Sequence, residues 1–190
     1  MNENLEHRIL LVDDEENITK SLHRLLRKEG WRIDMCNSGQ AALELISEVD
    51  APFSLIISDQ GMPGMSGSEF LEKAAEKMPE AVRFLLTGYS DIRAVEDAVN
   101  KGKIMRYLTK PWKDQSLLLH IRQAIEEVEL RKENERLTQL TKKQNRQLYE
   151  IGLTLEKKVR ERTEELKKKS ADLEDLNSKL ERSFLTTVHL

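Results

Sequence analysis

The chain has 190 residues, of which 34% are charged and 38% hydrophobic, with a formal net charge of -3. This length accommodates one domain of about 100 to 150 residues and a substantial appendage, and it excludes a large multidomain enzyme. The weak net charge argues against nucleic acid as a partner, because proteins that bind the DNA backbone carry a strongly basic surface. One cysteine, Cys36, excludes an internal disulfide, and four scattered histidines offer no zinc-ligand spacing.

The sequence contains no apolar run close to the about 18 to 20 residues needed to cross a bilayer. Its acidic, polar start, MNENLEH, lacks the basic and apolar regions of a signal peptide. We therefore expect a cytoplasmic protein without membrane contact.

The composition changes near Gln123. Residues 1–123 contain 36 charged residues and have a net charge of -4, whereas residues 124–190 contain 29 and have a net charge of +1. All four prolines and seven of the eight glycines lie in the first part, and Gly152 is the only glycine in the second. Since glycine and proline interrupt helices, this distribution predicts a compact domain over 1–123 and a long charged helix over 114–190.

Short apolar runs alternate with amphipathic segments throughout the compact part. The runs predict strands over 8–12, 31–36, 54–58, 82–87 and 104–109, and the segments between them predict helices over 18–26, 39–49, 68–78 and 91–102. The first, third and fourth strands are nearly all apolar, which is typical of parallel strands covered on both faces. The predicted fold is α/β, a (βα)5 doubly wound parallel five-stranded sheet.

Polar residues follow the ends of four predicted strands. Asp13 and Asp14 follow the first strand, Asp59 the third, Thr87 ends the fourth, and Lys110 follows the fifth. In doubly wound sheets the ligand site lies beyond the carboxyl ends of the strands, where the winding direction switches. We therefore expect three carboxylates, one hydroxyl and one ammonium to converge in a single crevice.

Such a cluster of carboxylates suggests a metal and a phosphoryl group. Carboxylates that lie close together repel one another, and a divalent cation such as Mg²⁺ relieves the repulsion while keeping waters and a phosphate nearby. A carboxylate can also attack phosphorus and form an aspartyl phosphate. Alternatively, the aspartates only cap helices or form turns, but this does not explain why Lys110 and Thr87 reach the same edge.

Four motifs, ILLVDDEEN, LIISDQGMPGMSG, FLLTGYSD and RYLTKPW, occur in order along residues 8 to about 123. In content and spacing they resemble the receiver domain of response regulators, which has a flavodoxin-like fold. The resemblance implies that Asp59 is the phosphoacceptor, Asp14 a direct Mg²⁺ ligand and Asp13 a ligand acting mainly through water. It also implies that the backbone carbonyl of Gly61 binds the metal, and that Gly61 and Tyr89 flank the phosphate.

The same resemblance implies a switch on the other side of the phosphate. Thr87 is similar to the switch hydroxyl, Lys110 to the phosphate-binding ammonium, and Tyr107 to the switch aromatic residue, whose ring turns inward when that hydroxyl is drawn to the phosphate. Packing alone could also explain Tyr107. Pro111 is implied to follow a cis peptide bond. The implied partner is a sensor histidine kinase or a phosphotransfer protein, and the implied chemistry is self-catalysed phosphorylation and dephosphorylation.

Three glycines after the third predicted strand, Gly61, Gly64 and Gly67, have spacing similar to that of a phosphate loop. They follow Asp59 in a GMPG turn, and the dinucleotide-binding pattern is absent. We therefore interpret them as turn residues.

The predicted helix from Asp114 first carries an apolar face that would close the compact domain. The residues of this face are Leu117, Leu118, Ile121, Ile125 and Val128. Two ladders with heptad spacing follow. The first consists of Leu130, Asn134, Leu137, Thr141, Gln144, Leu148, Ile151 and Leu155, and the second of Val159, Thr163, Leu166, Ser170, Leu173, Asn177, Leu180 and Phe184. The second ladder is displaced by one residue near Gly152, which resembles a skip in a coiled coil.

A solitary helix with so thin an apolar stripe is poorly stabilised, so we expect a parallel homodimeric coiled coil through residues of about 124–184. A single charged helix or a disordered tail is the alternative. Polar residues within the ladders weaken the coil, and buried asparagine can specify its register. We hypothesise that phosphorylation shifts the orientation or register of the coil, which needs only about a few kcal/mol of differential stability.

The helix should lead to an output domain that this sequence does not show. Chains with a receiver and a VRERTEEL coil resemble the beginning of HD-GYP cyclic-di-GMP phosphodiesterases, sensor kinases or diguanylate cyclases, and FLTTVHL favours the first. The chain itself is therefore predicted to be a signalling module. A phosphorylation-independent adaptor whose coil binds a partner is the alternative, and a metal-dependent phosphatase is a third, although Gly61 stands where such enzymes carry a second acidic residue.

Overall fold

The computed structural model describes residues 7–88 and 104–187. The chain divides into two compact units, Met1–Glu133 and Asn134–Leu190. The helix predicted over 91–102 and the predicted site residue Tyr89 lie outside the described residues.

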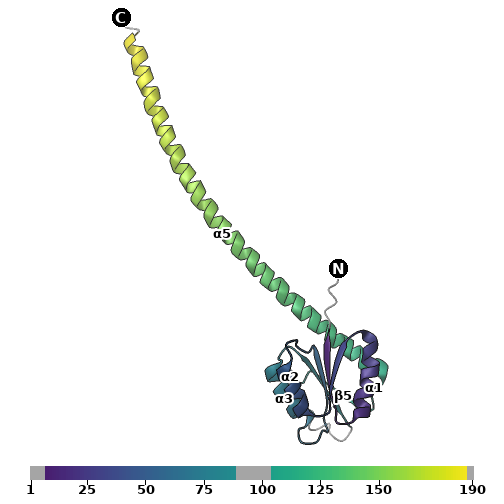
Figure 1. Cartoon of the computed structure of the whole chain (residues 1–190). Helices are drawn as coiled ribbons and strands as arrows, with labels where there is room; N and C mark the ends of the chain where they lie inside the picture. Colours follow the sequence, from purple (N-terminus) through teal and green to yellow (C-terminus); the bar gives the residue numbers. More distant parts are fainter. Residues whose placement is uncertain (1–6, 89–103, 188–190) are drawn as a thin grey trace. The chain divides into compact units, whose positions relative to one another are not determined.

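Five parallel strands form one sheet in the order β2-β1-β3-β4-β5. The elements in chain order are β1 (Arg8–Val12), α1 (Glu16–Leu26), the 3-10 helix η1 (Arg27–Glu29), β2 (Arg32–Cys36), α2 (Gly39–Glu48), β3 (Leu55–Asp59), α3 (Gly67–Lys77), β4 (Val82–Thr87), β5 (Arg106–Thr109) and α5 (Asp114–Thr187). The chain winds outward from β1 in both directions, so the predicted doubly wound α/β fold with a long C-terminal helix is confirmed (Figure 1).

The central strands are the most apolar ones for a physical reason. All five residues of β1 and of β3 are buried, because each of these strands has a neighbour on both sides and helices over both faces. The strands at the two edges, β2 and β5, carry exposed residues such as Met35 and Tyr107. The predicted fifth strand begins two residues later than expected, at Arg106.

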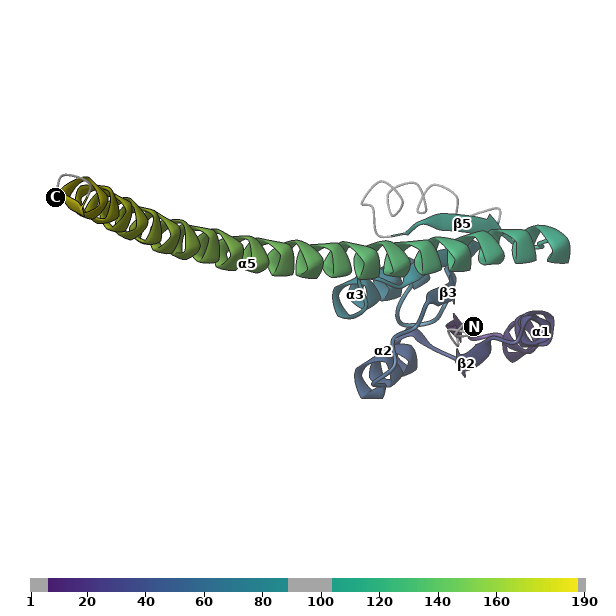
Figure 2. The same ribbon diagram turned by 90° about the horizontal axis from the view of Figure 1, so that it is seen from above.

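Two separate apolar clusters cover the two faces of the sheet. One contains Leu22 and Leu26 of α1 together with Leu117 and Ile121 of α5, and the other contains Ala42 of α2 and several residues of α3. In Figure 2, α1 lies on one side of the strands, and α2 and α3 lie on the other.

The beginning of α5, from Asp114 to Glu133, is part of the first unit. Three residues beyond Gln123, namely Ala124, Ile125 and Val128, are buried against the sheet, which extends this unit to Glu133. Polar contacts reinforce the packing. Arg122 donates two hydrogen bonds of 2.8 Å to Glu29, His7 Nε2 lies 2.8 Å from Glu129 Oε1, and Arg131 lies 3.5 Å from Glu80.

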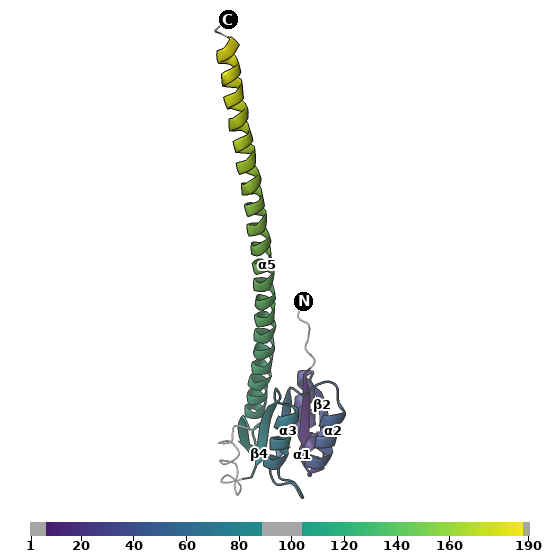
Figure 3. The same cartoon turned by 90° about the vertical axis from the view of Figure 1, so that its left-hand side faces the viewer.

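Beyond Glu133, α5 continues as one helix through the second unit (Figure 3). Every side chain described between 134 and 180 is exposed, including the large apolar ones. Ion pairs three or four residues apart line this part of the helix, for example Arg146 with Glu150 and Lys179 with Asp175. No helix among the described residues is long and apolar enough to cross a membrane.

Candidate functional site

The strand register brings the predicted site residues to one edge of the sheet. Val12, the residue before Asp13, lies opposite Ser58, and Asp59 lies opposite Leu86. On the far side, Thr87 pairs with Thr109, the residue before Lys110. Because parallel strands end at the same edge, these side chains come together although almost a hundred residues separate the first from the last.

Three carboxylates form the centre of the site. Oxygens of Asp13, Asp14 and Asp59 all lie within 4.8 Å of one another. Asp13 and Asp59 are only 2% and 7% exposed, whereas Asp14 faces solvent. Two buried carboxylates with a third beside them repel strongly in a medium that screens charge less than water does.

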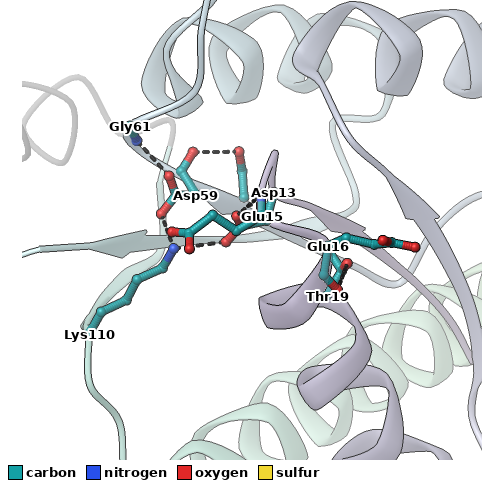
Figure 4. A network of polar contacts seen from close by, with 8 residues as sticks. Asp13, Glu15, Glu16, Thr19, Asp59, Gly61 and Lys110 are labelled. Atoms are coloured by element: carbon teal, nitrogen blue, oxygen red, sulfur yellow. Dashed lines mark hydrogen bonds and ion pairs between the residues drawn. The ribbon is translucent and has the colours of Figure 1, made fainter.

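Lys110 supplies the positive charge that offsets this repulsion (Figure 4). Its ammonium nitrogen lies 2.8 Å from Asp13 Oδ2 and 2.6 Å from Asp59 Oδ1. Burial lowers the pKa of Lys110, but the hydrogen bonds and charges of the two carboxylates outweigh burial and raise this pKa above its ordinary value. The lysine is therefore held in its charged form between two acids.

The pKa of Asp13 is shifted in the direction opposite to that of an ordinary ion-paired acid. Burial raises its pKa above the usual value, and the charge of Asp59 adds to this, whereas hydrogen bonds from Lys110 and from the N–H of Glu15 oppose it. The Glu15 N–H lies 2.9 Å from Asp13 Oδ1. Because the pKa of Asp13 is raised overall, the positive charge of Lys110 does not fully offset the burial of this carboxylate and its repulsion from Asp59.

The backbone around Asp59 fixes the direction of its carboxylate. The N–H of Gly61 donates a hydrogen bond of 2.7 Å to Asp59 Oδ2, so both carboxylate oxygens have a partner (Figure 4). Behind the side chain, a Cβ at Gly67 would lie 1.9 Å from the carbonyl oxygen of Asp59, which only glycine avoids. The start of α3 therefore packs directly against the backbone of Asp59.

The three glycines after β3 have different tasks. Gly64 has a φ of 81° and occupies a turn that favours glycine. Gly67 is the first residue of α3, after the N-cap Ser66, whose side chain forms a capping box with Glu69. The interpretation of Gly67 as a turn residue was therefore wrong, because the close approach of α3 to Asp59 requires glycine there. The sequence signal was the serine and glutamate of the capping box, which place the helix start at this glycine.

The two predicted switch residues lie on neighbouring strands, Thr87 at the end of β4 and Tyr107 within β5. Thr87 is fully buried, and its hydroxyl donates a hydrogen bond of 3.1 Å to the carbonyl oxygen of Gly88. Tyr107 is 45% exposed, with its side chain on the surface of the edge strand β5. The peptide bond between Lys110 and Pro111 is cis.

The donor set fits a hard divalent cation. Three carboxylates offer several oxygens within a small space, and exposed Asp14 leaves a side open to solvent, as suits a cation that keeps part of its water shell. Asp13, Asp14 and Asp59 are the residues of this cluster that would hold Mg²⁺; the backbone carbonyl of Gly61 remains a predicted ligand.

Comparison with known proteins gives a consistent family. A family model described as the response regulator receiver domain matches residues 9–122. The hydrogenase transcriptional regulatory protein HoxA of Cupriavidus necator is 36% identical over 118 residues, which are 62% of this chain and 24% of HoxA. The chain therefore spans about a quarter of the length of this curated relative.

Two solved structures share the fold of the first unit. One, described as adenylate cyclase from Rhodopirellula baltica, is 37% identical with a TM-score of 0.66, and the match covers 71% of this chain and 98% of that one. The other is the signal receiver domain of an HD domain-containing protein from Pseudomonas fluorescens. It is 37% identical with a TM-score of 0.61, and the match covers 65% and 98% of the two chains.

Proposed function

This chain belongs to the response regulator receiver family, and from that premise we propose that it accepts a phosphoryl group on Asp59 from a sensor histidine kinase or a phosphotransfer protein. The observation that carries the proposal is the setting of the Asp59 carboxylate. It lies at a strand end between the N–H of Gly61 and the ammonium of Lys110, beside two further carboxylates.

The transfer is a nucleophilic displacement at phosphorus. An oxygen of Asp59 forms a bond to phosphorus while the bond between phosphorus and the histidine nitrogen of the donor breaks, and that nitrogen keeps the electron pair. When bound, Mg²⁺ would supply positive charge that offsets the charge of the carboxylates and of the phosphoryl oxygens. The protein supplies the positions of these groups, which is most of what phosphoryl transfer requires.

Lys110 and Thr87 would follow the phosphoryl group. In the described state, the Lys110 ammonium bonds Asp59 Oδ1 and the Thr87 hydroxyl bonds Gly88. After transfer, each would exchange its present partner for a phosphoryl oxygen, and the new bonds would involve a charged acceptor. Tyr107, whose ring is on the surface, would then turn toward the space beside Thr87.

The phosphorylated state would reach an output module through a homodimeric coiled coil formed by residues of about 124–184. The exposed apolar ladder of α5 supports this part of the proposal. A cyclic-di-GMP phosphodiesterase is our candidate for the output, because VRERTEEL resembles the coils that precede such domains. The similar receiver from an HD domain-containing protein favours the same candidate. A cytoplasmic location follows from the kinase partner.

The test is intact mass spectrometry of the full chain after incubation with a small phosphoryl donor, with and without Mg²⁺. We expect one adduct that requires Mg²⁺ and is lost in Asp59→Ala. The matched control is Asp50→Ala, which removes an exposed aspartate outside the site and should leave the adduct unchanged. A folded protein that forms no adduct with several donors would overturn the proposal and favour an adaptor that acts without phosphorylation.

A further inference from the structure

The two heptad ladders of α5 form two seams, that is, two lines of exposed side chains along the helix. The second seam is displaced by one residue from the first, so the two lie on different faces of the helix. The first seam runs along the ladder from Asn134 to Leu155, and the second along the ladder from Val159. Leu148 and Leu155 in the first seam are 65% and 60% exposed, and Leu166 and Leu173 in the second are 66% and 65% exposed. Both seams are therefore uncovered in a single chain.

Neither seam can continue past the stretch between Leu155 and Val159. The next heptad positions of the first seam would be Lys158, Arg162, Glu165 and Lys169, and the preceding positions of the second would be Glu156, Gly152, Tyr149 and Asn145. All of these are exposed. All four positions that would continue the first seam are charged, and burying charged residues in a helix interface costs far more than burying leucine. Of the positions that would extend the second seam backward, Glu156 is charged, and Gly152 and Asn145 offer no large apolar side chain. The sequence therefore places the change of seam between Leu155 and Val159.

The change of seam also alters the average helical repeat. From Asn134 to Asn177, 43 residues complete 12 turns of the combined seam, or about 3.58 residues per turn. A heptad seam has 3.5 residues per turn and a straight α-helix about 3.6. The skip therefore cancels most of the left-handed supercoil that either seam would impose alone.

The chemistry of the seams selects their partner. Acidic and basic residues outside the seams pair within the helix, as Lys157 does with Glu161 and Arg162 with Glu165. The exposed apolar side chains of both seams would be covered by a helix whose own seam changes at the same skip. A second copy has that skip at the same level. The polar residues of the seams favour a parallel second copy. In a parallel pair Asn134 lies opposite Asn134 of the other copy, whereas in an antiparallel pair centred on the skip Asn134 lies opposite Leu180.

We propose that two copies of this chain pair in parallel and in register along α5, with a fixed joint between Leu155 and Val159 at which the seam changes helix face. This inference rests on the homodimeric coiled coil of the proposed function, and its consequence for signalling also rests on phosphorylation of Asp59. Because the register is fixed on both sides of the joint, the two helices do not slide along each other. A signal from the receiver is therefore transmitted as a rotation of one half of the coil relative to the other.

Disulfide crosslinking of the full chain tests the joint directly. In a Cys36→Ser background, single cysteines replace Val159, Leu166 or Leu173, and matched cysteines replace the preceding residues Lys158, Glu165 or Asp172. We expect at least about tenfold faster crosslinking at the first set, because adjacent residues face away from the seam. Equal rates in the two sets, or faster crosslinking at the preceding residues, would overturn the joint. So would a chain that stays monomeric and uncrosslinked.

A deletion pair tests the consequence for signalling. Removing Glu156 alone joins the two ladders into one continuous heptad, whereas removing residues 160–166 shortens the coil by one heptad and keeps the joint. We expect the phosphorylation-dependent change in crosslinking to survive only the second deletion. A change that survives both deletions would overturn relay through the joint. Intact mass spectrometry measures the Asp59 adduct independently of crosslinking, so a failure of phosphorylation is distinguished from a failure of the relay. The crosslinking pattern without a phosphoryl donor tests the joint in either case.

Discussion

The ammonium of Lys110 touches two carboxylates that would otherwise repel each other in a buried site. It lies 2.8 Å from Asp13 and 2.6 Å from Asp59, and Asp13 still has a raised pKa because burial outweighs the lysine. The residue has two tasks in this setting. It offsets the charge of two buried carboxylates, and under the proposed function it would follow a phosphoryl group on Asp59.

Replacing Lys110 by alanine should lower the free energy of unfolding by about 3 kcal/mol, because two buried carboxylates lose their counter-charge. Mg²⁺ should restore part of this loss, since a cation that binds only the folded state adds stability by mass action. Urea unfolding with and without Mg²⁺ measures both effects. The control is Lys113→Ala, which removes an exposed lysine and should change stability by less than about 0.5 kcal/mol. Equal losses in the two variants would contradict the structural task of Lys110.

Gly67 is required by close approach and not by its backbone angles. A Cβ there would meet the carbonyl oxygen of Asp59 at 1.9 Å, so Gly67→Ala must push α3 away from β3. We expect a loss of about 3 kcal/mol in the free energy of unfolding and a lower yield of the Asp59 adduct. Gly61→Ala serves as the folding control, because its Cβ would lie at an ordinary 3.5 Å from Asp59 Oδ2. Wild-type stability of the Gly67 variant would show that the helix start can move freely.

At the scale of elements, the start of α5 is held to the first unit by side chains that sequence periodicity does not reveal. Arg122 bonds Glu29 of η1, and Glu129 bonds His7 at the start of β1. His7 is 6% exposed and also lies 3.1 Å from the hydroxyl of Ser54. These contacts fix the helix at the positions from which the second unit continues.

The pair of Arg122 and Glu29 should make stability depend on pH. Hydrogen bonds from Arg122 lower the pKa of Glu29 in the folded state. A depressed carboxyl pKa gives stability that is present above the ordinary value and is lost as pH falls through the folded value. Arg122→Gln should therefore be less stable than the wild type at pH 7, and the difference should shrink between about pH 5 and pH 3.

Urea unfolding across this range measures the effect, with Arg146→Gln as the control. Arg146 pairs with Glu150 on a fully exposed part of α5, where such pairs contribute little. A stability difference between Arg122→Gln and the wild type that stays constant from pH 7 to pH 3 would exclude Glu29 as its source.

At the scale of the whole molecule, the two units are stabilised in different ways. The first buries two apolar clusters on either side of a sheet, whereas the exposed leucines of the second need a partner helix to be covered. Gly152 is the one described glycine of the second unit, and a Cβ there would meet nothing within 4 Å.

Gly152→Ala should stabilise α5 by about 1 kcal/mol per chain, because alanine is the better helix former. Circular dichroism of the full chain during heating should show a higher melting temperature for the helical transition. The transition of the receiver, followed by tryptophan fluorescence from Trp31 and Trp112, should stay unchanged. A decrease in helix stability would mean that glycine is required at this position by a contact with the partner.

The amino-acid sequence was sufficient to predict the order of the described elements, the parallel sheet and the set of strand-end residues. Hydrophobic runs and periodicity are local properties, and the rule that parallel strands end at one edge brings Asp13, Asp59 and Lys110 together without coordinates. Residue Tyr89 and the helix over 91–102 remain predictions, as do the roles of the site residues.

The contacts between individual atoms of the site could not be predicted from the sequence and came from the three-dimensional fold. The bridge formed by Lys110, the N–H of Gly61 on Asp59 and the requirement for glycine at 67 depend on distances between segments far apart in the chain. The raised pKa of Asp13 likewise depends on burial by residues from several strands and helices. Such properties arise from packing in three dimensions, which hydrophobic periodicity along the chain does not specify.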